Sequence, residues 1–332
     1  MDEEKDLKTI VLNELRKKGG YLSGQELADL AGVSRTAVWK AVNALTEDGC
    51  RIDAVRNRGY LLVSEPDILS AAYAGDLLPA SFSAGTVEFY DAVDSTNNRL
   101  RQLGEEGAAE GSLAAAEVQT AGKGRRGRTW VSGPGTALTF SVLLRPDVPP
   151  EKAPMLTLCA ALAVYRAVSS LTGLPLGIKW PNDIVCRGKK LCGILTEMSA
   201  DMDRVHYVIV GIGLNVSAED FPEELADKAC SIRSEGGKSI PRLRLLKGIL
   251  EELESVYRKF LADGSLKGLR GEYEAALANL GQQVSVLEPQ GDWQGLCRGI
   301  TDEGALLVKA GDGSVREIIS GEVSVRGIYG YV

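Results

Sequence analysis

Residues 119–131 read QTAGKGRRGRTWV, with four basic side chains and three glycines between Gly122 and Arg128. Such a segment is typical of a nucleic-acid patch, of a loop that cradles a phosphate, or of a solvated surface turn. It lacks the GxxxxGKS or GxxxxGKT pattern of a P-loop. Because the strand-like residues 136–146 follow it, it does not open the helix of a Rossmann turn either. The segment therefore predicts a loop between two strands, in which glycine backbone and guanidinium groups can bind an anion.

The composition is that of an ordinary globular protein, with 44% hydrophobic and 25% charged residues. A length of 332 residues predicts two or three domains, since a single core rarely grows beyond about 250–300 residues. No apolar run approaches the roughly 18 residues of a membrane span, and the acidic N-terminus lacks a signal segment. The six cysteines contain no CxxC pair, which argues against disulfides or structural zinc. We therefore expect a cytoplasmic protein with no membrane partner.

The one histidine, His206, lies in the strand-like run 205–216, and we interpret it as a strand residue with a hydrogen-bonded imidazole. A Ser–His–Asp triad or a multi-histidine metal site would have to be built around this one side chain. Chemistry is expected instead to rely on positioning and on lysine and arginine charges.

Residues 1–64 form the first predicted domain, and their apolar spacing is that of a helix-turn-helix. A first helix ends at the glycine pair 19–20. Ser23 and Glu26 have the spacing of a capping box at the start of a second helix, and Gly32 makes the turn that follows.

A third helix, capped by Ser34, carries the polar face that would enter the major groove of DNA. Residues 50–63 then alternate like a hairpin and add a wing. Residues 19–64 hold five basic and five acidic side chains, so geometry rather than charge indicates DNA binding. The residues expected to contact DNA are Ser34, Arg35, Thr36, Trp39, Lys40, Asn43, Arg56 and Arg58. The alternative is a small helical interaction domain that never touches DNA.

Residues 65–280 alternate between strand-like and helical patterns, which predicts a central α/β domain within a multi-domain α+β chain. Strands are expected at 85–93, 111–120, 136–146, 176–180, 190–199 and 205–216, with a hairpin over 184–190. Helices are expected at 94–103, 151–173, 242–262 and roughly 265–280.

Further polar motifs accompany the basic loop along the chain. DSTN (94–97) begins a helix whose exposed N–H groups suit an anionic or carbonyl ligand. KWPND (179–183) places a lysine, an aromatic ring, a proline turn and two amide or carboxylate groups together. GKKLCGILTE (188–197) begins a strand with paired lysines, and GIGLNV (211–216) ends another with two glycines and an asparagine.

In this order and spacing, DSTN, QTAGKGRRGRTW, KWPNDI, KKLCGILTE and VGIGLNV resemble the biotin–protein ligases. With the winged helix in front, the whole chain resembles the members that are both biotin ligase and biotin operon repressor. The resemblance implies a central domain of the class II synthetase type that uses ATP and Mg²⁺ to activate biotin as biotinyl-5′-AMP. It implies three partners, which are the biotin carboxyl carrier protein of acetyl-CoA carboxylase, operator DNA and, with adenylate bound, a second copy of the chain.

Matched to the family's motifs, the residues expected to bind biotin are Ser95, Thr96, Asn97, Gln119, Lys123, Gly124, Arg125, Lys190, Gly193, Gly211 and Gly213. The adenylate or ATP is expected to contact Lys123, Arg125, Arg126, Arg128, Trp130, Asn182 and Asn215. The expected catalytic residues are Lys190, Arg125 and Asp183, with Asp183 also expected to hold Mg²⁺. The family often has arginine where this chain has Lys123, which keeps the charge but not the bidentate geometry. Structural roles remain the alternative for Trp130, Trp180, Lys190 and Asp183.

Residues 281–332 alternate with period two between turn signals, which predicts a five-stranded barrel. The resemblance makes this barrel SH3-like. Its simplest role is a structural cap, and in the family it also helps to close the ATP site. Arg316 and Arg326 would then contribute weakly to that site.

Three other functions stay open at this point: a lipoate–protein ligase, a repressor that senses biotin without ligating it, and a winged-helix regulator with an unrelated sensor domain. The basic loop argues against the first, and the presence of Lys190 and Asp183 argues against the second. A winged helix fused to a ligase suggests that the adenylate orders the loop, favours the dimer and so raises operator affinity.

Overall fold

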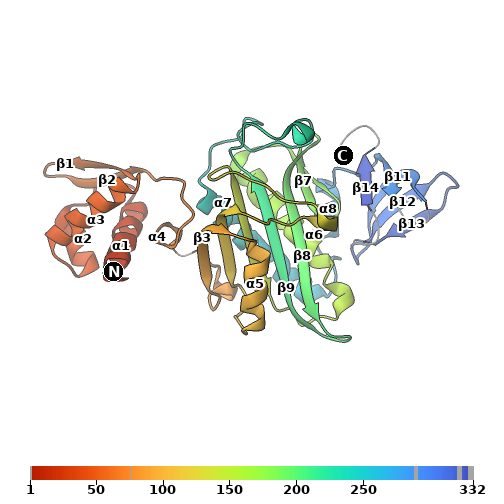
Figure 1. Ribbon diagram of the computed structural model, residues 1–332, viewed down its shortest axis with the longest axis horizontal. Helices are drawn as coiled ribbons and strands as arrows, with labels where there is room; N and C mark the ends of the chain where they lie inside the picture. The colour runs from red at the N-terminus through yellow and green to blue at the C-terminus, as the bar shows by residue number, and fades with distance from the viewer. Residues whose placement is uncertain (1, 76, 288–290, 320–323, 328–332) are drawn as a thin grey trace. The chain divides into compact units, whose positions relative to one another are not determined.

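The computed structural model describes residues 2–75, 77–287, 291–319 and 324–327. Its α-carbon contacts divide the chain into two compact units, residues 1–77 and 78–332. Figure 1 draws both, coloured from red at the N-terminus to blue at the C-terminus. The division falls beyond residue 64, where the sequence placed the end of the first domain.

The first unit contains a helix-turn-helix followed by a hairpin. Its elements are α1 (Asp2–Lys18), α2 (Gly24–Ala31), α3 (Arg35–Glu47), β1 (Arg51–Val55) and β2 (Gly59–Ser64), the two strands pairing antiparallel. Ser23 and Glu26 form the reciprocal capping bonds of a capping box at the start of α2. At the start of α3, Ser34 Oγ accepts from the backbone of Ala37 at 3.2 Å. Both caps and the hairpin were predicted from the sequence.

Residues 65–75 belong to this first unit because α1 holds them. Arg16 donates to both carboxylate oxygens of Glu65, and also to the carbonyl of Tyr73 at 2.9 Å. Tyr73 lies in the short helix α4 (Ala71–Ala74) and is buried, with its hydroxyl 3.8 Å from Cys50 Sγ. The beginning of the segment that was assigned to the central domain, residues 65–280, is therefore packed against α1 of the first unit.

The second unit is built on a seven-stranded sheet in the order β3-β4-β5-β9-β8-β7-β6. The strands are β3 (Val87–Val93), β4 (Leu113–Gln119), β5 (Ala137–Leu144), β6 (Leu176–Lys179), β7 (Asp183–Cys186), β8 (Lys189–Ala200) and β9 (Val205–Asn215). The neighbours β3 and β4 are parallel, with the helix α5 (Thr96–Glu105) between them in sequence, and the other five neighbouring pairs are antiparallel. The sequence missed β7, which was expected to be part of a hairpin over 184–190. Its four residues are all buried, so a short strand of this kind shows no alternation to detect.

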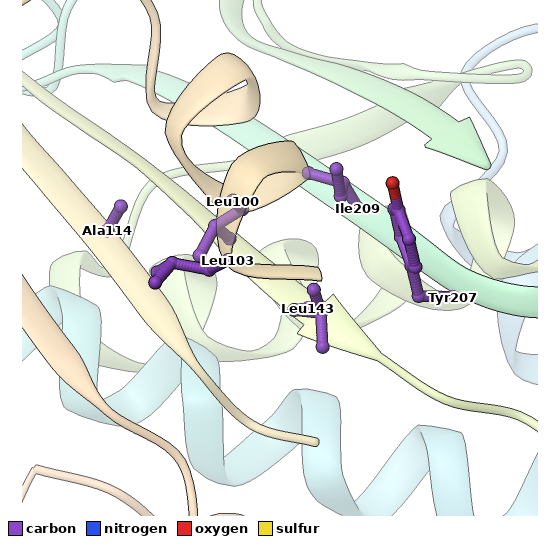
Figure 2. Packing of buried hydrophobic residues seen from close by; sticks show 6 residues of the cluster. All are labelled: Leu100, Leu103, Ala114, Leu143, Tyr207 and Ile209. Carbon is purple, nitrogen blue, oxygen red and sulfur yellow. The ribbon is translucent and has the colours of Figure 1, made fainter. Parts of the chain in front are cut away.

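Helices cover both faces of the sheet. Adjacent strand residues point to opposite faces, and in β8 Thr196 bonds to Thr157 of α6 (Met155–Thr172), whereas Glu197 bonds to Asn97 of α5. The helix α7 (Arg242–Asp263) packs against α6 and β5. Figure 2 shows the apolar contact under α5, where the described cluster consists of Leu100, Leu103, Ala114, Leu143, Tyr207 and Ile209.

Residues Pro150–Thr172 are long and apolar enough to cross a membrane by length and composition. The expectation that no apolar run approaches this length was therefore wrong. However, 72% of the most apolar window is buried inside the protein, as α6 packs between the sheet and α7. This is the behaviour of a core helix.

The C-terminal part is an antiparallel sheet in the order β13-β12-β11-β10-β14. Its strands are β10 (Gln283–Leu287), β11 (Trp293–Ile300), β12 (Leu306–Ala310), β13 (Val315–Ile318) and β14 (Ser324–Gly327). Five strands were predicted here. The buried Trp180, which follows β6, donates its indole N–H to the carbonyl of Gly304 at 3.0 Å. On the same side, Glu274 of α8 (Arg270–Ala276) accepts from the backbone of Ile300. The helix α8 is shorter than the one expected over 265–280.

Candidate functional site

On one face of β9, large side chains are followed along the strand by glycines. Tyr207 and Ile209 pack under α5, and the next two residues on the same face are Gly211 and Gly213. On the neighbouring strand β8, Gly193 lies opposite Gly213. Because strand side chains repeat every two residues, these missing side chains hollow one face of the sheet. A pocket lies above them, lined by residues of α5, the basic loop, β8 and β9.

None of these three glycines can be replaced without moving a neighbour, which at Gly193 is the flexible end of Lys190, 2.9 Å from the new Cβ. A Cβ on Gly211 would lie 2.2 Å from Asn97 Oδ1, and a Cβ on Gly213 would lie 2.5 Å from the ring of Trp130. Real Cβ contacts essentially never fall below 3.0 Å. The floor of the pocket is therefore backbone, approached from above by an amide and an indole ring.

One end of the pocket is lined by uncharged hydrogen-bonding groups. The backbone N–H of Thr96, in the first turn of α5, donates to Gln119 Oε1 at 2.7 Å. The Thr96 hydroxyl lies 2.7 Å from Ser141 Oγ, which donates to Asn97 Oδ1 at 2.6 Å. Thr96, Asn97 and Ser141 are all buried. This end can bind a neutral polar group.

The other end is cationic. Arg125 of the basic loop donates to Asn182 Oδ1 at 2.9 Å, and Lys190 Nζ lies 2.7 Å from Asp183 Oδ1. Asn182 joins the two pairs by donating to Asp183 at 3.1 Å. Burial lowers the pKa of Arg125, and the nearby Asp183 opposes that shift. A guanidinium keeps its charge in proteins, so this end suits an anion such as a carboxylate or phosphate.

The basic loop folds back on itself and carries Trp130 over the pocket floor. Gly124 N donates to Arg128 O at 2.7 Å, and Trp130 N donates to Gly122 O at 3.0 Å. In the described part of the chain, the buried indole Nε1 of Trp130 has no hydrogen-bond partner. Buried donors of this kind are rare, and a ligand in the pocket could satisfy it.

The pocket brings together all the residues expected to bind biotin, and Trp130 and Asn182 as well. Its lining includes Ser95, Thr96, Asn97, Gln119, Lys123, Gly124, Arg125, Trp130, Asn182, Lys190, Gly193, Gly211 and Gly213. Asp183 lies just behind it and reaches it through Lys190.

Three residues expected at the nucleotide lie elsewhere. Arg126 and Arg128 are exposed on the loop outside the pocket lining. Asn215 donates its side-chain amide to the carbonyl of Cys230 at 3.0 Å. That segment in turn pairs with the backbone of Lys190, since Cys230 N donates to Lys190 O at 2.9 Å. Asn215 therefore contacts the pocket residue Lys190 indirectly, through the backbone of Cys230.

Sequence reasoning missed several residues of the pocket. Phe140, Ile194, Leu195 and Ile212 also line it. Ser141 and Glu197 hold Thr96 and Asn97 through their side chains. The alternation of the strand patterns predicts the face of the sheet on which each of these residues lies. The pairing of β5 and β8 with β9 brings the residues together, and this pairing cannot be predicted from a single sequence.

The residues expected to contact DNA lie on α3 and the wing. Ser34, Arg35, Thr36, Trp39, Lys40, Arg56 and Arg58 are exposed, and Asn43 is half-buried. Trp39 leaves 54% of its surface exposed although Val38, Val42 and Leu45 on the same helix are buried. An indole exposed on a polar helix face is unusual in a core-forming helix and is compatible with a binding surface.

Two further expectations concern residues outside the pocket. His206 is a strand residue of β9, as predicted, and its Nε2 lies 3.0 Å from Asp201 Oδ2. Arg316 lies over the ring of Trp293, 4.8 Å from its centroid, within the C-terminal sheet. The side chain of Arg326 lies outside the described side chains.

No group of three or more His, Cys, Asp or Glu side chains that could hold a metal occurs in the described part of the chain. Mg²⁺ commonly binds one or two carboxylates together with substrate phosphates and water. Asp183, with Oδ1 already contacting Lys190 and Asn182, therefore fits Mg²⁺ only as an ion that arrives on a nucleotide.

The six cysteines are free thiols and all are buried.

The three parts of the chain match three known families. Residues 89–215 match the biotin/lipoate A/B protein ligase family, residues 8–61 match the HTH domain, and residues 280–326 match the biotin protein ligase C terminal domain. The matched ranges coincide with the seven-stranded sheet, the helix-turn-helix and the C-terminal sheet described above.

Relatives of known name are similar over nearly the whole chain. The bifunctional ligase/repressor BirA of Bacillus subtilis (strain 168) is 38% identical over 95% of this chain and 97% of its own length. BirA of Escherichia coli (strain K12) is 28% identical over 94% of this chain and 95% of its own length. A structure of the biotin protein ligase from Aquifex aeolicus, in complex with biotin and ATP, has a TM-score of 0.63 and 34% identity. It covers 73% of this chain and 99% of its own length. The chain is a biotin protein ligase, and it belongs to the bifunctional ligase/repressor family.

Proposed function

We propose that this enzyme first joins biotin to AMP from ATP and then transfers the biotinyl group to a lysine of a biotin carboxyl carrier protein. The observation that carries the proposal is the polarity of the pocket. A neutral hydrogen-bonding end at Thr96 and Asn97 and a cationic end at Arg125 and Lys190 share one backbone floor. Biotin has a neutral ureido ring at one end and a carboxylate at the other, and it matches this polarity.

In the first step, the biotin carboxylate oxygen attacks the α-phosphorus of ATP, and pyrophosphate leaves. Lys123, Arg125 and Lys190 neutralise negative charge on the transferring group. When bound, Mg²⁺ would supply further charge neutralisation on the phosphates, and Asp183 is the carboxylate that would hold it. In the second step, the lysine amine of the carrier attacks the acyl carbon and AMP leaves. The protein needs no nucleophile of its own.

The basic loop has a second role in this proposal. Biotinyl-5′-AMP is a mixed anhydride and is attacked by water, so the site must exclude solvent. Trp130 and Gly122 close the ends of the loop over the pocket floor, which supports this role.

We further propose that the first unit represses transcription in response to biotinyl-5′-AMP. The exposed polar face of α3 and the arginines of the wing support operator binding. A two-fold operator requires two copies of the chain, so the adenylate-bound homodimer is the proposed DNA-binding form. Free buried thiols support a reducing cytoplasm as the location.

The ligase proposal is tested by incubating the full chain with biotin, ATP, Mg²⁺ and a carrier domain, and measuring the mass of the carrier. A biotinyl addition that disappears when the acceptor lysine is replaced is the expected result. A parallel reaction with lipoate tests the lipoate-ligase alternative, and preferential lipoylation would contradict the proposal. A chain that binds biotin but modifies no carrier would instead be a sensor without ligase activity.

A further inference from the structure

A hydrogen-bond chain leads out of the neutral end of the pocket to an ion pair behind it. Asn97 Nδ2 donates to Glu197 Oε2 at 2.7 Å, and Arg101 donates to the other carboxylate oxygen, Oε1, at 2.8 Å. Glu197 belongs to β8 and Arg101 to α5. Neither residue lines the pocket. Glu197 therefore touches the site only through Asn97.

The carboxylate fixes the orientation of the Asn97 amide and, through it, the proton of Ser141. A carboxylate only accepts hydrogen bonds, so Asn97 must turn its NH₂ group to Glu197 and its oxygen into the pocket. Ser141 must then donate its single proton to Asn97 Oδ1, at 2.6 Å. Having spent that proton, Ser141 can only accept from Thr96, whose hydroxyl lies 2.7 Å away.

The fixed direction decides what the pocket offers a ligand. Asn97 Nδ2 is used by Glu197 and faces the carbonyl of Leu195 at 3.5 Å, so Asn97 presents an oxygen lone pair directly above Gly211. The single hydroxyl proton of Thr96 goes either to Ser141 Oγ or to Gln119 Oε1, which lies 3.1 Å away. In both cases Thr96 also presents a lone pair to the pocket. This end of the pocket thus accepts hydrogen bonds from N–H groups, which the ureido ring of biotin has and the dithiolane ring of lipoate lacks.

We propose that Glu197, held by Arg101, is a positioning residue that sets this polarity and so tunes the site for a ligand with N–H donors. The inference rests on the proposed biotin activity. Without the carboxylate, the direction of these hydrogen bonds can reverse. An amide at position 197 can either accept from Asn97 or donate to it, and the hydroxyls of Thr96 and Ser141 can rotate. With the hydrogen bonds reversed, the pocket would present N–H and O–H groups toward the N–H edge of the ligand.

The test is steady-state kinetics of the full chain with the variant Glu197→Gln, which keeps the shape of the side chain. The KM for biotin should rise roughly tenfold, the effect of about one misdirected buried hydrogen bond. The kcat at saturating biotin and the KM for ATP should not change, because the cationic end of the pocket is untouched. Arg101→Gln leaves the carboxylate in place and should raise the biotin KM in the same direction by a smaller factor.

The chain offers a matched control. Glu88 of β3 forms a similar pair with Arg99 of α5, at 2.7 Å from Nε, without contact to the pocket. Glu88→Gln should therefore leave the biotin KM unchanged. An unchanged biotin KM in Glu197→Gln would overturn the inference, as would equal changes in the KM values for biotin and ATP or the same change in the control. Failure of the wild-type chain to biotinylate a carrier would instead overturn the proposed function, and this inference with it.

Discussion

At the scale of single residues, the site depends on side chains that are missing as much as on those present. Gly211 and Gly213 stand where the same face of β9 would otherwise continue the core of Tyr207 and Ile209. Asn97, above Gly211, is held by hydrogen bonds to Ser141 and Glu197, whereas Trp130 lies above Gly213. The effect of replacing each glycine by alanine therefore depends on the neighbour that the new Cβ would meet.

Gly211→Ala and Gly193→Ala are predicted to differ. At Gly211 the new Cβ meets Asn97 Oδ1 at 2.2 Å, and Asn97 is held from both sides by Ser141 and Glu197. Overpacking of about 1–3 kcal/mol should weaken biotin binding roughly 5- to 150-fold. At Gly193 the Cβ meets the flexible end of Lys190 at 2.9 Å. This end can shift at a smaller cost, so the loss of biotin binding should be smaller than at Gly211. Calorimetric titration of biotin measures both, and equal losses would contradict the argument.

Asp183→Ala is predicted to slow the transfer step. Asp183 pairs with Lys190 at 2.7 Å, beside the cationic end of the pocket, where it can orient or deprotonate the incoming amine. Transfer from pre-formed adenylate to a carrier domain should fall by at least about tenfold. Single-turnover transfer with the purified adenylate complex measures this step alone. An unchanged transfer rate would remove Asp183 from this role.

At the scale of elements, one buried ion pair connects three parts of the central domain. Arg242 at the start of α7 is 1% exposed and donates to both oxygens of Glu117 on β4, at 2.7 and 2.9 Å. Glu117 also accepts from the backbone of Gly135, in the turn before β5. The strand β4 ends at Gln119, which contacts Thr96. The pair therefore fixes both ends of the segment that carries the basic loop.

Arg242→Met is predicted to destabilise the second unit strongly. Removal of one partner from a buried ion pair costs about 3–5 kcal/mol, and a unit of this size loses about 2–4 °C of melting temperature per kcal/mol. The melting temperature should therefore fall by roughly 6–20 °C in a thermal unfolding experiment. The double variant with Glu117→Gln should recover part of the loss, because the stranded charge is then absent.

A surface pair provides the comparison. Arg233 and Glu219 lie 3.2 Å apart with 59% and 70% of their side chains exposed. Exposed pairs of this kind contribute at most about 1 kcal/mol, so Arg233→Met should shift the melting temperature little. A similar shift in the two arginine variants would show that burial of the Arg242 pair has no special effect.

At the scale of the whole molecule, a DNA-binding fold and a ligase fold form two separate compact units of one chain. The first unit includes residues 65–75, which Arg16 ties to α1. The C-terminal sheet, by contrast, joins the ligase unit through Trp180 and Glu274. A response of transcription to an effector bound in the second unit requires that binding there changes the DNA affinity of the first unit.

The predicted consequence is that biotin and ATP together raise operator affinity. A coupling free energy of about 1–3 kcal/mol corresponds to roughly 5- to 150-fold. Fluorescence anisotropy of labelled operator DNA measures the affinity, and sedimentation measures the dimer under the same conditions. Equal affinities with and without the two ligands would exclude the coupling but leave the ligase proposal intact.

The sequence by itself determined the local elements and the membership of the site. Capping residues such as Ser23 and Ser34, and the alternation of β9, depend on neighbours in the chain and can be read from it. The resemblance to a known family supplied most of the pocket residues, which lie in a few short motifs, but it did not supply the apolar ones such as Phe140. Short or doubly buried elements such as β7 escaped detection because four buried residues show no period.

The tertiary structure alone decided how those motifs meet. Ser141 and Arg101 lie outside the quoted motifs, and Glu197 ends the motif GKKLCGILTE without a predicted role. All three acquire a role only because β5 and β8 flank β9 and α5 packs against this part of the sheet. The same holds for Arg242, which becomes important through its distant partner Glu117. Periodicity gives the face on which a side chain lies, but the pairing of strands far apart in sequence gives its neighbours, and the hydrogen bonds and charges of the site depend on those neighbours.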